Sequence, residues 1–230
     1  MGYTVMSHVA NAASVPVGLR GVVTDWSGEK QAFQVPWGKA MMWIFLLSDT
    51  FIFTSFLTGY MHVRTSTTVP WPNPSEVFAL EIAGHHIPLI LIAIMTFTLI
   101  TSSGTMALAV NYGYRRDRTK TMLLMLATAA LGATFVGMQA FEWTKLIVYE
   151  GVRPWGNPMG ASQFGACFFM ITGFHGLHVS VGVIYLSTVA FKVFRGDYES
   201  RGYEIVEIAG LYWHFVDLVW VFIFALFYLW

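Results

Sequence analysis

The stretch that decides the fold is FFMITGFHGLHVSVGVIY, residues 168–185. It lies inside a run that contains no Asp, Glu, Lys or Arg and is bounded by Arg153 and Lys192. A helix needs about 20 mainly apolar residues to cross a bilayer, so this run is long enough to span one. The sequence therefore predicts a transmembrane helix over residues 162–191.

Two histidines, His175 and His178, lie in the middle of this stretch. On a helix they share a face with Ile171 and Gly182, because residues at i, i+4, i+7 and i+11 line up. Imidazoles deep in a membrane normally face other protein rather than lipid. Gly182 has no side chain on that face and would let a neighbouring helix come close. We therefore expect this stripe to pack against other helices.

The composition indicates a membrane protein. Of the 230 residues, 56% are hydrophobic and only 11% are charged, whereas a soluble domain usually carries about 25% charged residues. The formal net charge is zero, which gives no indication of a nucleic-acid partner. The single cysteine, Cys167, excludes an internal disulfide and any Cys-pair metal or redox motif. The first residues lack a basic segment followed by an apolar core, so no cleaved signal peptide is expected.

Hydrophobic runs predict an all-α, polytopic bundle of five transmembrane helices. Proline and glycine in residues 1–38 argue against a long helix there, so we expect a cytoplasmic N-terminal segment followed by one transmembrane domain, residues 39–230. The predicted helices cover residues 40–63, 85–112, 121–148, 162–191 and 203–229.

The distribution of basic residues predicts the orientation. Ten Lys and Arg residues fall in the segments on one side of the predicted bundle, and three fall on the other side. Because cytoplasmic loops carry the excess of positive charge, the N-terminus is predicted to be cytoplasmic and the C-terminus outside. An odd number of helices requires opposite ends, so the two predictions agree.

Several polar side chains lie within the predicted helices. An ionised Asp at a helix centre costs about 2.5–3.5 kcal/mol on insertion scales, so polar residues at similar depth are expected to meet one another. Glu142 is predicted nearer the outer surface. The others are predicted between the inner third and the middle of the bilayer: Asp49, His175, His178, His214 and Asp217.

Three roles for these residues are open from the sequence. In a structural role, the side chains hydrogen-bond across helices and fix the bundle. In a proton-related role, Asp49 exchanges protons near an aqueous entrance. In a metal-binding role, His175-x-x-His178 and His214-x-x-Asp217 supply four ligands from two facing helices. Any helical stripe produces the same spacing, so the spacing alone does not choose among the three.

Lys192 and Arg195 form a basic pair at the predicted cytoplasmic end of the fourth helix. Such residues anchor a helix end at the membrane surface. They also suit an anionic lipid headgroup that lies between helices. The two functions are compatible, and both are expected here.

Four segments resemble subunit III of the haem–copper terminal oxidases. The stretch TGFHGLHVSVG, followed by Lys192-x-x-Arg195, resembles the penultimate helix of that family. The ending AGLYWHFVDLVWVFIFALFYLW is similar to its last helix. MQAFEW and WIFLLSDTFIF resemble two further segments, the second of which carries an intramembrane carboxylate. The resemblance covers roughly residues 37–230 and is closest to short bacterial forms with five helices.

The resemblance implies a role for each of these positions. The family's intramembrane carboxylate is a glutamate and falls on Asp49, whose side chain is shorter. The basic pair falls on Lys192 and Arg195, and the resemblance argues against a metal site. It implies a chain without haem or copper that packs against catalytic subunit I and subunit II, binds phospholipid, and supports oxygen access and proton uptake.

The expected function is therefore that of a non-redox subunit of a proton-pumping oxidase in the bacterial cytoplasmic (inner) membrane. Haem and copper are expected in the partner subunit, which reduces dioxygen to water. The electron donor, cytochrome c or quinol, is left open. Two alternatives remain from the sequence: an accessory subunit of a nitric-oxide reductase on the same fold, and a metal-dependent membrane oxygenase.

Overall fold

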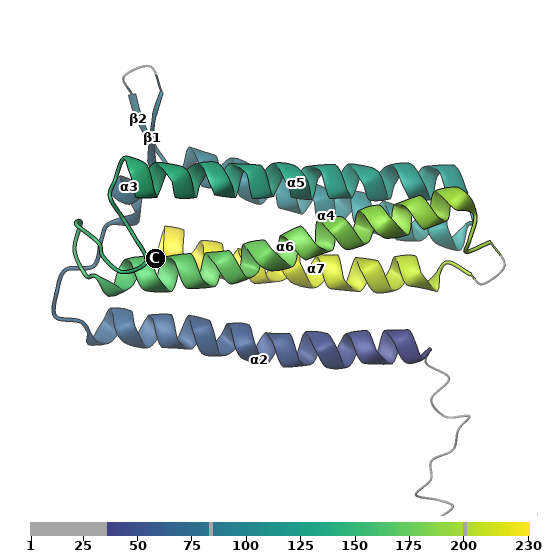
Figure 1. Ribbon diagram of the computed structural model, residues 1–230, viewed down its shortest axis with the longest axis horizontal. Helices are drawn as coiled ribbons and strands as arrows, with labels where there is room; N and C mark the ends of the chain where they lie inside the picture. Colours follow the sequence, from purple (N-terminus) through teal and green to yellow (C-terminus); the bar gives the residue numbers. More distant parts are fainter. Residues whose placement is uncertain (1–35, 83–84, 200–201) are drawn as a thin grey trace, which may run out of the picture. The chain divides into compact units, whose positions relative to one another are not determined.

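The computed structural model describes residues 36–82, 85–199 and 202–230 (Figure 1). Within these residues, five helices are long and apolar enough to cross a membrane, which confirms the predicted all-α, multi-pass fold. The predicted N-terminal segment lies outside the described residues except for positions 36–38. The five helices are α2 (Trp37–Ser66), α4 (Ile90–Tyr114), α5 (Arg118–Val148), α6 (Gln163–Arg195) and α7 (Glu204–Phe224), which continues as the π-helix η1 (Ala225–Leu229).

The second long helix begins later than predicted. A short helix, α3 (Pro74–Val77), leads into a two-stranded antiparallel hairpin. Its strands are β1 (Ala79–Ile82) and β2 (His85–Pro88). The predicted start at residue 85 is therefore wrong, because residues 85–88 pair as a strand. Pro88 disfavours helical geometry at the residue before it, and Leu89 adopts φ 59° before α4 starts.

Two other helix ends have clear local causes. The Asp117 carboxylate accepts a hydrogen bond from the backbone N–H of Lys120 at 3.2 Å, so α5 starts at Arg118 rather than near residue 121. That backbone hydrogen bond and the Lys120 ammonium lower the pKa of Asp117. At the same end of the bundle, Gly196 adopts φ 83° and terminates α6 at Arg195, four residues beyond the predicted end.

Helices α4, α5, α6 and α7 form a closed group in the compact unit Gly38–Trp230. Helix α4 packs beside α5 and α7, and α6 packs beside the same two helices. Hydrogen bonds join the group: Trp213 Nε1 donates to Ser102 Oγ at 2.9 Å, and Trp220 Nε1 donates to Thr96 Oγ1 at 3.0 Å. We call α4–α7 the four-helix group.

The indole ring of Trp213 fills the centre of the four-helix group and is fully buried. A Cβ added at Gly132 on α5 would lie 2.4 Å from this ring, and one added at Gly182 on α6 would lie 2.9 Å from it. Both glycines therefore leave space that a large aromatic side chain on α7 occupies. The close approach predicted at Gly182 is present, and its partner is the α7 helix.

Helix α2 runs beside α6 and α7 (Figure 1). Its side chains contact both helices. At its first turns, the Lys39 ammonium forms an ion pair with Glu207. Near its other end, the Tyr60 hydroxyl donates to the Leu226 carbonyl at 3.2 Å. Arg64 donates to the Trp230 carbonyl and stacks over the Trp230 ring, 4.2 Å from its centroid. Contacts near both ends thus tie α2 to α7 and η1.

The packing of Trp213 predicts that Gly132→Ala lowers the stability of the protein. The added methyl group would clash with a ring that is fully buried and hydrogen-bonded, so the ring cannot move away freely. We expect a loss of about 1–3 kcal/mol in stability, the range for overpacking a core. The measurement is the unfolding midpoint of the purified protein in a mild detergent.

Gly137→Ala is the matched control on the same helix, because a Cβ there meets nothing within 4 Å. It should leave the midpoint unchanged or raise it slightly, since Ala favours helix more than Gly does. Equal midpoints for the two variants would show that Trp213 does not depend on the space left by Gly132.

Candidate functional site

An acid–imidazole pair joins α2 to α6 in the middle of the protein. Asp49 on α2 is 3% exposed, and its Oδ2 atom lies 3.2 Å from Nε2 of His178 on α6. The other ring nitrogen of His178, Nδ1, lies 2.8 Å from the Phe174 carbonyl oxygen. The Tyr212 hydroxyl donates to the His178 carbonyl at 2.9 Å, which ties α7 to the same turn of α6.

His175 is separated from this pair although it is only one helical turn away. Its side chain is fully buried, and neither ring nitrogen has a hydrogen-bond partner among the described residues. The ring stacks on Trp220 with centroids 5.4 Å apart and meets the Phe135 ring edge-on at 5.9 Å. His175 therefore sits in an aromatic cage of the four-helix group.

The last-helix pair, His214 and Asp217, lies between α7 and α4. His214 Nδ1 is 2.7 Å from the Ser103 hydroxyl oxygen. Asp217 is 9% exposed, and neither of its carboxylate oxygens has a hydrogen-bond partner among the described residues. Both residues line a hollow of about 240 Å³ between the two helices.

Glu142 occupies a third location, between α5 and η1. It is 3% exposed, and its Oε2 atom accepts a hydrogen bond from the Tyr228 hydroxyl at 3.2 Å. Its other carboxylate oxygen has no partner among the described residues, and neither has the side-chain amide of the neighbouring Gln139. Glu142, which the sequence predicts nearer the outer surface of the membrane, points into the protein interior.

The structure does not bring the four residues of the metal hypothesis together. His178 faces Asp49, His214 faces Ser103, and His175 is enclosed by aromatic rings. Across residues 36–82, 85–199 and 202–230, no three His, Cys, Asp or Glu side chains are grouped so that they could hold a metal ion. The arrangement therefore does not support the four-ligand geometry of the metal-binding alternative.

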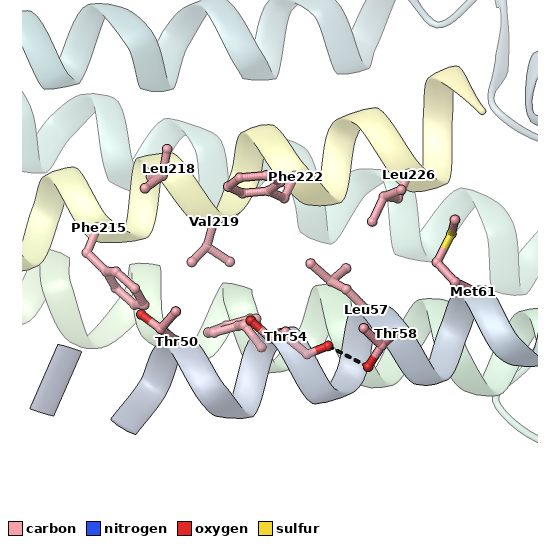
Figure 2. Close-up of a pocket in the computed structure, with 11 residues that line it drawn as sticks. Thr50, Thr54, Leu57, Thr58, Met61, Phe215, Leu218, Val219, Phe222 and Leu226 are labelled. Atoms are coloured by element: carbon pink, nitrogen blue, oxygen red, sulfur yellow. Dashed lines mark hydrogen bonds between the residues drawn. The ribbon is translucent and has the colours of Figure 1, made fainter. Parts of the chain in front are cut away.

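A long apolar groove runs between α2 and α7 (Figure 2). Its main hollow has a volume of about 390 Å³, and a second hollow of about 320 Å³ extends it towards Trp43 and His214. In Figure 2, Val219 and Leu226 point towards α2, and Leu57 of α2 points back towards them. The main hollow is lined by Thr50, Phe53, Thr54, Leu57, Thr58 and Met61 of α2 and by Phe215, Leu218, Val219, Phe222 and Leu226 of α7 and η1.

Two of the three threonines that line the groove, Thr50 and Thr58, are compatible with an apolar occupant. Thr50 Oγ1 donates to the Leu46 carbonyl at 2.7 Å, and Thr58 Oγ1 donates to the Thr54 carbonyl at 2.8 Å. A hydroxyl that is bonded to its own helix no longer requires a partner in the groove. Our sequence reasoning did not identify these residues, although Thr50, Thr54 and Thr58 form an i, i+4, i+8 stripe that would have marked this face of α2.

Lys192 and Arg195 are exposed in the last turn of α6. The Arg195 guanidinium lies 6.0 Å from the centroid of the Phe191 ring. This position suits anchoring at a membrane surface, and binding of a lipid headgroup remains a prediction.

Comparison with known proteins shows the family. Residues 7–230 match the family described as "Cytochrome c oxidase subunit III". A "Probable quinol oxidase subunit 3" of Staphylococcus saprophyticus is 31% identical over 83% of this chain and 88% of its own length. A "Cytochrome c oxidase subunit 3" of Alkalihalophilus pseudofirmus is 31% identical over 81% of this chain and 84% of its own length. With five membrane-spanning helices and a family match across almost its whole length, the chain belongs to the cytochrome c oxidase subunit III family of the haem–copper oxidases.

Proposed function

We propose that this chain is a non-redox subunit that supports a proton-pumping oxidase, in which a partner subunit reduces dioxygen to water. Family membership supports this proposal. Relatives with equal identity to this chain are named for quinol and for cytochrome c, so the comparison favours neither electron donor. The chain would hold no haem or copper, and subunits I and II would be its partners.

The proposed location is the bacterial cytoplasmic membrane, with the N-terminus in the cytoplasm. Five helices with the length and hydropathy of membrane spans support a multi-pass protein. The excess of Lys and Arg on the N-terminal side supports the orientation.

The observation that supports lipid binding is the groove between α2 and α7. Its main hollow has a volume of about 390 Å³, its lining is almost entirely apolar, and it lies between two helices that are long and apolar enough to cross a membrane. An acyl chain of a phospholipid fits these properties, because close contact between apolar atoms contributes favourable dispersion energy. Lipid bound here would fill the space between α2 and the four-helix group and support assembly. The apolar lining of the groove also suits dioxygen, which is a small apolar molecule.

Asp49 and His178 are proposed to hold one proton between them. The Phe174 carbonyl can only accept a hydrogen bond, so His178 Nδ1 carries a hydrogen. If Nε2 and the carboxylate were both without a hydrogen, two lone pairs would face each other at 3.2 Å in a buried site. A proton on either atom makes the contact attractive, and the pair then carries no net charge. Such a pair is suited to take up and release a proton.

The first test concerns the groove. Thr54→Trp would place an indole in the main hollow, and we expect the purified complex to lose most of the lipid held there. The measurement is the number of phospholipids retained in native mass spectrometry. Ser55→Trp is the control, because Ser55 is exposed on the same helix but does not line the groove. Equal lipid retention in both variants would contradict binding in this groove.

The second test separates a proton-related role of Asp49 from a structural one. Asp49→Asn keeps a donor for His178 Nε2 but cannot exchange a proton, whereas Asp49→Ala removes the contact. A proton-related role predicts that both variants lose oxygen-reducing activity during sustained turnover. A structural role predicts loss only in Asp49→Ala. The measurement is oxygen consumption over many turnovers, together with the number of protons moved per electron.

A third test determines which atoms of Asp49 and His178 carry hydrogen. We expect nitrogen-15 NMR of histidine-labelled protein to show a protonated Nδ1 at His178 at neutral pH. We also expect the infrared band of a protonated carboxyl, or the signal of a doubly protonated His178, to disappear in Asp49→Asn. An ionised Asp49 beside a neutral His178 would rule out the shared proton.

A further inference from the structure

The face of the four-helix group between α4 and α7 differs from an ordinary lipid-facing surface. We call it the α4–α7 face, and it consists of Ile100, Ser103, His214, Asp217, Leu218 and Val221, which surround the hollow of about 240 Å³. Its apolar members are exposed: Ile100 by 56% and Leu218 by 55%. Amid them are an imidazole, a hydroxyl and a carboxylate at the middle of their helices.

Of the three polar side chains of this face, Ser103 and His214 contact each other, whereas the Asp217 carboxylate is not satisfied within the described residues. Asp217 offers two carboxylate oxygens that find no hydrogen-bond partner among the described residues. The nearby Ser103 hydroxyl contacts His214 Nδ1 at 2.7 Å, and it has a single hydrogen to give. Two carboxylate oxygens can accept several hydrogen bonds, so Asp217 remains underbonded even if Ser103 turns towards it.

Lipid tails cannot supply a hydrogen-bond donor for the Asp217 carboxylate. Hydrocarbon tails carry no hydrogen-bond donors, and an unpaired polar group in the membrane core is costly. The outward surface of α6 provides the contrast, since Leu177, Val181 and Ile184 are exposed by 58%, 50% and 67%. That apolar surface suits lipid. The α4–α7 face, which contains the unpaired Asp217 carboxylate, is instead suited to contact with protein.

We infer that the α4–α7 face is the docking surface for a transmembrane helix of a partner subunit. That helix presents a hydrogen-bond donor, such as a hydroxyl, amide or indole N–H, at the depth of Asp217. Its apolar side chains cover Ile100 and Val221. This inference rests on the proposed function, in that a partner subunit exists, and it adds the face and the residues that receive it.

The docking surface and the proposed lipid groove are neighbours on α7. Leu218 borders both hollows, with the groove on the side of α2 and the docking surface on the side of α4. His214 likewise lines the second hollow of the groove and the hollow at α4. A partner helix on this face would therefore also close one wall of the groove.

The experiment is site-specific photo-cross-linking in intact membranes. A photoreactive amino acid at Ile100 is compared with one at Leu177, which has nearly the same exposure but lies on the apolar surface of α6. We expect Ile100 to give a covalent adduct with another membrane subunit in clearly greater yield than Leu177. A yield at Ile100 no higher than at Leu177, or adducts with lipid alone, would overturn the inference.

A pair of substitutions tests the hydrogen bond. Asp217→Leu is close in size but accepts nothing, whereas Asp217→Asn keeps an acceptor. Asp217→Leu should release the partner subunit about threefold to twentyfold more readily on detergent dilution, the range for one hydrogen bond between membrane helices. Asp217→Asn should release it much less. Equal release by both variants would contradict the role of Asp217.

The two proposals fail in different ways. A chain that copurifies with a haem-containing partner but gives no adduct at Ile100 would overturn the docking surface and leave the proposed function intact. A chain that copurifies with no other subunit would overturn both.

Discussion

The packing of Trp213 against two glycines is the contact on which the rest of the structure depends. Gly132 and Gly182 let α5 and α6 come close enough to enclose the indole ring from α7. The ring's N–H is satisfied by Ser102 of α4, so one side chain contacts all three neighbouring helices. In a membrane, where lipid tails are as apolar as the core, such close packing and interhelical hydrogen bonds replace the hydrophobic driving force. The four-helix group is therefore a closely packed platform.

Helix α2 is attached to this platform in a different way. It is fixed by polar contacts near both ends and by Asp49 and His178 in the middle. Between these contacts, its threonine stripe faces α7 across an apolar groove. The separation of α2 from the platform is what creates space for an apolar ligand. The polar contacts and the groove thus belong to one arrangement.

The buried polar residues fall into distinct environments rather than one cluster. His175 is enclosed by aromatic rings, Glu142 is bonded to Tyr228, and Asp49 faces His178. These three lie in the interior or between helices of this chain. Asp217 differs because its unpaired oxygens lie beside an exposed face, whereas the unpaired atoms of His175 and Glu142 are enclosed by this chain. A buried acceptor without a donor is costly, which is why this position points to another chain.

The sequence by itself determined the existence of five spans, the family and the set of polar residues inside the membrane. Hydropathy and motifs are local properties, so they are read from consecutive residues. Local chemistry also decided some helix ends, although strand pairing at residues 85–88 overrode the predicted start of α4. Helical periodicity predicted that His175 and His178 share a face.

Only the tertiary structure decided which partner each side chain meets. His175 and His178 are three residues apart, yet one enters an aromatic cage and the other faces Asp49. Periodicity gives the direction of a side chain, but its partner depends on which helix lies opposite and how far away. The groove also depends on the tertiary structure, because it forms where the side chains of α2 and α7 face each other without filling the space between them.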